Sequence, residues 1–160
     1  MKSIKHLILL ISASLSILAS APLLAHTDAV LDTQKAPNGG QLRMAGVYHF
    51  ELVLPNDQQR EHQHDTKHDT KQENENQILI FVTDHAGTKI PTTGATGTAT
   101  IMSGKQKATV TLIPDGDNKL KGVGKFAASA DTKVVVSITM AGKPAEQARF
   151  TPQAVVKHAH

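Results

Sequence analysis

From residue 47 onward, short runs in which apolar and polar residues alternate predict β-strands. In Val47–Leu54 every second residue is apolar, and the polar His49 and Glu51 lie between them. Further short apolar or alternating runs follow at Gln77–Thr83, Gly97–Ser103, Lys107–Ile113, Lys119–Phe126, Lys133–Met140 and Gln147–Pro152. Gly, Pro, Asp and Asn separate these runs, and no helical period persists over a dozen residues. We therefore expect an all-β fold of about seven strands, either an antiparallel β-sandwich of the immunoglobulin-like kind or an open barrel.

One of these runs contains two glycines where a core strand usually carries side chains. Gly122 and Gly124 lie two residues apart, on one face of Lys119–Phe126. Such glycines mark a bulge or a close approach of another backbone. Because no strand-to-helix context surrounds them, they do not predict a phosphate-binding loop.

A long polar segment separates the first two predicted strands. It contains the stretch REHQHDTKHDTKQENEN and has no apolar residue from Asn56 through Asn76. Such a segment buries too little surface to offset the entropy of ordering it, and hairpin loops are usually far shorter. We expect a disordered insertion over 56–76, at one end of a single β-domain spanning 37–152.

The N-terminus has the order of a secretory signal peptide. Lys2 and Lys5 precede an apolar stretch, Leu7–Leu18, and small residues follow. Cleavage after Ala25 is expected; cleavage after Ala21 and an uncleaved anchor are the alternatives. Residues 1–25 are thus a predicted signal peptide, 26–36 a flexible N-terminus and 153–160 a C-terminal tail. The predicted location is the periplasm, without stable membrane insertion after cleavage.

Charge and cysteine content narrow the classes of partner. The 17 basic residues fall by two when Lys2 and Lys5 leave, which against 14 acidic residues gives a net charge of about +1. This balance does not favour a nucleic-acid or anionic-membrane partner. With no cysteine in the chain, disulfides and thiolate chemistry are excluded. A bound metal would need His, Met, carboxylate or backbone ligands.

The insertion is the first candidate metal site. His62, His64 and His68 lie close together in sequence, with Asp65 and Asp69 between and after them. Imidazole is a common ligand of Cu(II) and Zn(II), and a flexible His/Asp-rich tract can wrap such an ion. The alternative is a solvated loop whose histidines bind metal only opportunistically.

Two further candidates lie outside the insertion. Cleavage after Ala25 would give His26 both a free α-amine and an imidazole, a nitrogen pair suited to Cu(II). On the polar face of the first predicted strand, His49 and Glu51 could form a rigid site with His85. This requires the first two strands to be neighbours, and we then expect His85 near the root of the insertion. The alternative is a solvated strand face.

The methionines and the C-terminal histidines are weaker indications of a metal site. Met44, Met102 and Met140 are scattered singly, as core methionines are. His158 and His160 belong to the C-terminal tail. Because the chain has no G-x-S-x-G elbow, H-E-x-x-H helix or cysteine nucleophile, we do not expect an enzyme.

Two segments carry a resemblance to a known group of proteins. The stretches APNGGQLRMAGVYHFELVL and ILIFVTDHAGTKIP resemble small exported proteins found with bacterial heavy-metal resistance systems. They are also similar to the N-terminal metal-resistance segment of periplasmic adaptors of copper and cobalt–zinc–cadmium efflux pumps of the resistance–nodulation–division type. The likeness spans Ala36 to Pro152 and is interrupted by the insertion. Its pattern has an A-P-x-G-G opening, a short strand, an H-F-E element that matches His49 and Glu51, and a turn that matches Asp84 and Gly87. From the sequence we expect neither the helical hairpin nor the lipoyl-like domain of a full adaptor.

The resemblance implies a periplasmic location and a metal context. With the histidines, it predicts a protein that binds or buffers copper or zinc and is linked to metal resistance or efflux, with efflux components of the envelope as partners. The rival interpretation is a metal-free interaction module that binds another periplasmic protein.

Overall fold

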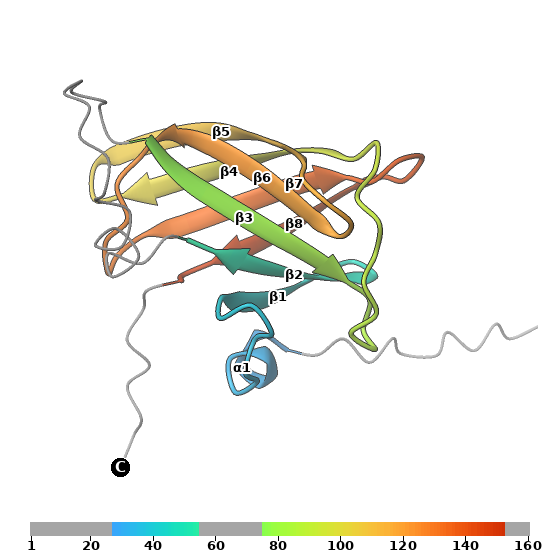
Figure 1. Cartoon of the computed structure of the whole chain (residues 1–160). Coiled ribbons are helices and arrows are strands. Elements are labelled where there is room, and N and C mark those ends of the chain that lie inside the picture. Colours follow the sequence, from blue (N-terminus) through green and yellow to red (C-terminus); the bar gives the residue numbers. More distant parts are fainter. Residues whose placement is uncertain (1–26, 55–74, 153–160) are drawn as a thin grey trace, which may run out of the picture.

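The computed structural model describes residues 27–54 and 75–152, which form one short helix and eight strands (Figure 1). Four parts of the chain lie outside these residues: the predicted signal peptide, His26, the insertion except for its last two residues, and the C-terminal tail. The elements are α1 (Asp28–Leu31), β1 (Gln41–Ala45), β2 (Tyr48–Val53), β3 (Glu75–Thr83), β4 (Thr96–Ser103), β5 (Gln106–Pro114), β6 (Lys119–Lys125), β7 (Lys133–Thr139) and β8 (Ala145–Phe150).

The strands form a single antiparallel sheet that nearly closes on itself. Their order is β1-β2-β3-β6-β5-β4-β7-β8, and each pair of neighbouring strands is antiparallel. The two end strands, β1 and β8, lie against each other. The Thr151 N–H donates to Gln41 Oε1 at 2.8 Å across this seam. The prediction of an all-β antiparallel fold is confirmed.

The core lies between the two halves of the curved sheet. Alternate residues of the strands point inward, including Phe50 and Leu52 of β2 and Ile78 and Ile80 of β3, all fully buried. On β6 the inward positions after Leu120 are Gly122 and Gly124. A Cβ at Gly124 would lie 2.7 Å from Val110 Cγ2, and one at Gly122 2.9 Å from the Thr111 carbonyl oxygen. The expected close approach is therefore confirmed, and β5 packs directly on β6.

The seven strands predicted from apolar and polar alternation are all present, with ends shifted by at most two residues. β1 corresponds to the short strand that only the resemblance implied, and α1 was not predicted. Arg43 explains why the alternation did not reveal β1. It is the cross-strand partner of Phe50 and is buried on the core-facing side of β1. Its guanidinium donates to Asp32 at 2.7 Å and pairs with Asp28 at 3.6 Å, and this hydrogen bond lowers the pKa of Asp32. Arg43 thus places a charged residue at a position of β1 where an apolar residue is expected. Its ion pairs with Asp28 and Asp32 hold α1 against the sheet.

The strands on either side of the insertion are direct neighbours. β2 pairs with β3, and His49 lies opposite Thr83. β3 begins at Glu75, so Glu75 and Asn76 belong to a strand rather than to the insertion; the Asn76 amide donates to the Phe126 carbonyl. Within the described residues, no helix has the length and apolar character needed to cross a membrane.

Candidate functional site

His49 is the second residue of β2 and lies on its outer face. Phe50 and Leu52 face the core, so His49 and Glu51 project from the opposite side of the strand. His49 is nevertheless only 8% exposed. Something other than the core must therefore cover this part of the outer face.

The cover is supplied by His85, which follows β3. The imidazole rings of His49 and His85 are stacked, with centroids 4.9 Å apart and planes 15° from parallel. His85 itself is exposed to solvent. The structure thus brings together two of the predicted site residues from two neighbouring strands.

A tight turn holds His85 in this place. The Asp84 carboxylate accepts hydrogen bonds from the backbone N–H groups of Ala86 and Thr88, each at 2.8 Å. The Thr88 hydrogen bond is the main reason why the pKa of Asp84 lies below its ordinary value. Gly87, with φ of 82°, closes the turn by donating to the Asp84 carbonyl. The hydrogen bonds within this turn therefore fix the backbone position of His85. Only the side chain of His85 keeps conformational freedom.

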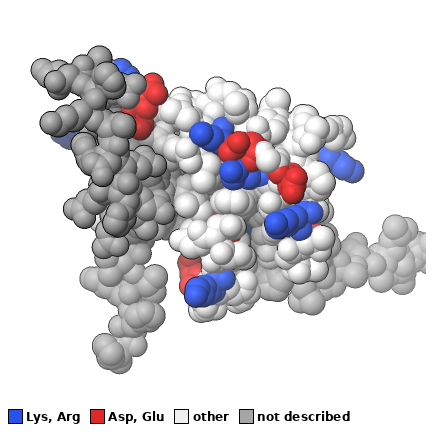
Figure 2. All heavy atoms as spheres, viewed as in Figure 1, with Lys and Arg blue, Asp and Glu red and all other residues white. Residues whose placement is uncertain are grey.

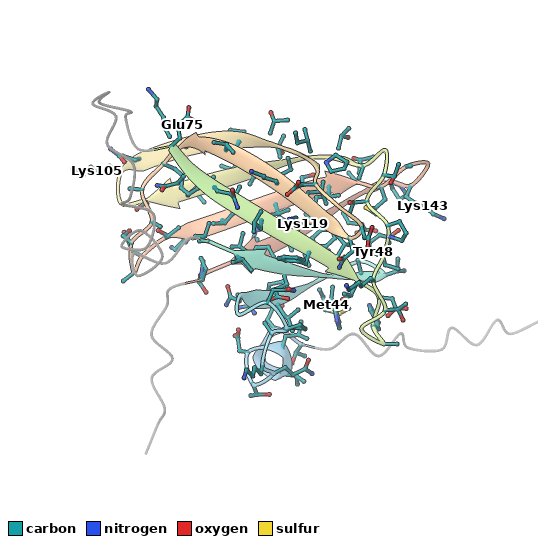
Figure 3. The ribbon with its side chains drawn as sticks, in the orientation of Figure 1. Met44, Tyr48, Glu75, Lys105, Lys119 and Lys143 are labelled. Carbon is teal, nitrogen blue, oxygen red and sulfur yellow. The ribbon has the colours of Figure 1, made fainter. Side chains whose placement is uncertain are left out.

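The predicted position of His85 near the root of the insertion is wrong. In an antiparallel hairpin the connecting segment joins the end of the first strand to the start of the second. The insertion is therefore rooted at Leu54 and Glu75, whereas His49 lies near the start of β2 and His85 follows the end of β3. Figure 3 shows Glu75 at one end of the sheet and Met44 and Tyr48 at the other. Nine residues of β3 separate the two ends, a length of about 25 Å.

Glu51 has a different environment from His49. It is 3% exposed, and its two oxygens accept hydrogen bonds from Asn38 N, Asn38 Nδ2 and Gly40 N at 2.8–2.9 Å. These bonds dock the Ala36–Gly40 turn on β2, so the A-P-x-G-G and H-F-E elements of the resemblance touch each other. A role of Glu51 as a metal ligand stays a prediction, and it would require these hydrogen bonds to be given up.

From the sequence, Met44 was predicted to belong to the core, and this prediction is wrong. It is the cross-strand partner of His49, and only part of its side chain is buried, outside the core cluster. Met102 was also predicted to belong to the core and is 36% exposed. Met140 is 6% exposed and belongs to the core as expected. The register of β1 would have placed Met44 opposite His49. The inward-facing Arg43 prevents this register from being recognised in the sequence.

The described residues form no large patch of a single charge on the face shown in Figure 2. On the face shown in Figure 2, small groups of basic and acidic side chains are interspersed among uncharged residues. Among the residues that the structure describes, no three His, Asp or Glu side chains gather into a metal-binding group. The candidate site is therefore a pair of imidazoles with a methionine beside it, not a carboxylate cage.

Six predicted ligands lie outside the described residues. They are His26, His62, His64, Asp65, His68 and Asp69. Comparison with known proteins adds no ligand set: no family model, no curated protein and no solved structure matches this chain.

Proposed function

We propose that this chain binds a transition-metal ion, copper or zinc, in the periplasm, and that the His49–His85 pair is the part of the folded domain that holds it. The observation behind this proposal is the stacking of the two imidazoles at 4.9 Å. One histidine lies on β2 and the other on the turn after β3, and from this distance they need only a small movement to ligate one ion.

The required movement falls on the exposed partner. Metal–imidazole bonds are about 2.0–2.1 Å long, so the two ligating nitrogens must come within about 4 Å of each other. Parallel rings direct their lone pairs in parallel, and one ring must turn for the lone pairs to converge. His85 is solvent-exposed and can turn about its side-chain bonds, whereas His49 is held between the sheet and its neighbours.

Histidine binds a metal ion through its neutral imidazole, so protons compete with the ion for the ring nitrogens of any histidine ligand.

The wider role follows the resemblance to metal-resistance proteins. A buffer for copper or zinc would lower the free ion concentration in the periplasm and present the ion to efflux components. The His-rich insertion would supply a second, separate binding segment, because its roots lie at the opposite end of β2 and β3. The predicted signal segment supports the periplasmic location.

Calorimetric titration with Cu(II) and then Zn(II) tests the proposal. It would compare the unaltered chain with His85→Gln and with a triple change of His62, His64 and His68 to Ala. We expect His85→Gln to lower the affinity of one class of site and the triple change to leave that class intact. If His85→Gln has no effect while the triple change abolishes binding, the site lies in the insertion. If no variant differs because none binds, the metal-free interaction module becomes the leading function.

A further inference from the structure

The side chain across the β1–β2 ladder from His49 is a thioether. Met44 and His49 are directly opposed, so they share the outer face, with Cβ atoms about 4.5–5.5 Å apart. The sulfur of Met44 lies two bonds beyond its Cβ on a flexible, unbranched chain. It can therefore reach the space beside the His49 ring.

The donors beside the pair differ from those that zinc prefers. Zinc sites take thiolate, imidazole or carboxylate ligands, and the chain has no cysteine. The two carboxylates next to the pair in sequence are committed elsewhere: Glu51 to the turn at Asn38 and Gly40, and Asp84 to its own turn. The described residues thus offer no third hard ligand here, but they do offer a soft one.

We propose that Met44 is the third ligand of this site and that the preferred ion is soft and monovalent, Cu(I), with Ag(I) as its analogue. This inference rests on the proposed function, because it takes metal binding by His49 and His85 as given. Thioether ligands select Cu(I) over the harder divalent ions, and imidazole accommodates copper as well as zinc. Three ligands, two nitrogens and one sulfur, complete a low-coordinate site without carboxylates.

The partial exposure of Met44 has a consequence for exchange. A ligand at the surface can be displaced by a donor from an incoming carrier, while His49 stays in place under the Asp84–Thr88 turn. The metal ion would then enter and leave the site past the side chains of Met44 and His85.

Met44→Leu is the variant that isolates the sulfur, since it conserves volume and removes only the thioether. Cu(I) affinity would be measured under reducing conditions against a chromophoric Cu(I) chelator, and Zn(II) affinity by calorimetry. We expect Met44→Leu to weaken Cu(I) binding about tenfold or more and to change Zn(II) affinity by less than about threefold. Met102→Leu is the matched control, because Met102 is also partly exposed but lies on β4; it should change neither affinity.

A residue-specific signal completes the test. Addition of Ag(I) should shift the ¹H–¹³C methyl resonance of Met44, identified by its loss in Met44→Leu, and leave that of Met102 in place. Unchanged Cu(I) affinity in Met44→Leu, or an unshifted Met44 methyl signal, would overturn the assignment of the thioether. Cu(I) and Zn(II) affinities that His85→Gln leaves unchanged, with His62, His64 and His68 changed to Ala in both proteins, would instead overturn the proposed function, so the two failures are distinguishable.

Discussion

The outer face of β2 carries two polar residues, each covered by a turn, and the two turns do different things. The Ala36–Gly40 turn satisfies Glu51 completely, with backbone and side-chain donors on both carboxylate oxygens. The Asp84–Thr88 turn brings a second imidazole against His49 and uses its own carboxylate to hold itself together. Both residues are buried and polar, yet only His49, together with His85, belongs to the metal site that we propose.

The difference teaches that burial alone does not identify a site. A buried carboxylate whose acceptors are filled by backbone N–H groups contributes to stability. Two adjacent imidazoles can also act as metal ligands, which is the role that we propose for His49 and His85. Substitutions in the two turns should therefore separate into losses of folding free energy and losses of metal affinity.

The largest expected effect is that of Glu51→Ala. It leaves the N–H groups of Asn38 and Gly40 without their acceptor, and we expect a loss of about 3 kcal/mol in the free energy of unfolding. Glu51→Gln, which keeps the shape and one acceptor oxygen, should lose about half as much. Urea denaturation measures both changes. Zn(II) affinity should be unaltered in the folded Glu51→Gln protein; a tenfold loss there would make Glu51 a ligand and remove the contrast between the two turns.

The glycines of the two turns give the next contrast. A Cβ at Gly40 would collide with the Leu52 carbonyl, whereas one at Gly87 would meet no atom within 4 Å. We expect Gly40→Ala to cost about 3 kcal/mol through overpacking against backbone. Gly87→Ala should cost about 1 kcal/mol, because only its positive φ opposes a side chain. Thermal or urea unfolding of the two variants compares them, and equal losses would contradict the difference in packing.

His85→Gln should lie at the other extreme for stability. His85 is exposed, and losing one stacked ring should change the free energy of unfolding by less than about 1 kcal/mol. The same variant should lose metal affinity, as described above. Paired denaturation and titration measurements check this, and a large stability loss without an affinity change would reassign His85 to a structural role.

The smallest effect concerns pH and the Asp84 turn. Hydrogen bonding to the turn lowers the pKa of Asp84 below its ordinary value of 3.8. A carboxyl whose pKa is lower in the folded protein stabilises the fold above its unfolded pKa. That contribution is lost as the pH falls below 3.8 through the folded pKa. NMR titration of the Ala86 and Thr88 amides should show their shifts following this protonation, and Asp84→Asn should remove the transition. Shifts that persist in Asp84→Asn would mean that another group controls the turn.

The sequence predicted most of the strands because their inner faces follow the period of two. β3, β5 and β7 show it plainly, and Gly122 and Gly124 were correctly expected to mark a close backbone approach. β1 was beyond this reasoning because its inward position is Arg43. Its charge is tolerated only because Asp28 and Asp32 of α1 neutralise it, a long-range pairing that local patterns do not contain.

The candidate site was predictable in part. The sequence led to the hypothesis of a rigid site of His49, Glu51 and His85, and the structure brings the two histidines together because β2 and β3 are neighbours. Their position relative to the insertion was mistaken, although antiparallel pairing alone places them at the far end. Met44 could not be assigned without the register of β1, and that register depends on the Arg43 pairing.

The seam between β1 and β8 determines how the domain responds to a pulling force. The start of β1 and the end of β8 meet where the Thr151 N–H donates to Gln41, so the chain enters and leaves the sheet at one point. A load applied through the flanking segments would act across the strands at this point. It would break the ladder bonds of β1–β2 or β7–β8 one after another rather than all together. The domain should therefore open by peeling from its seam at low force, while the β2–β3 hairpin that carries His49 and His85 opens later.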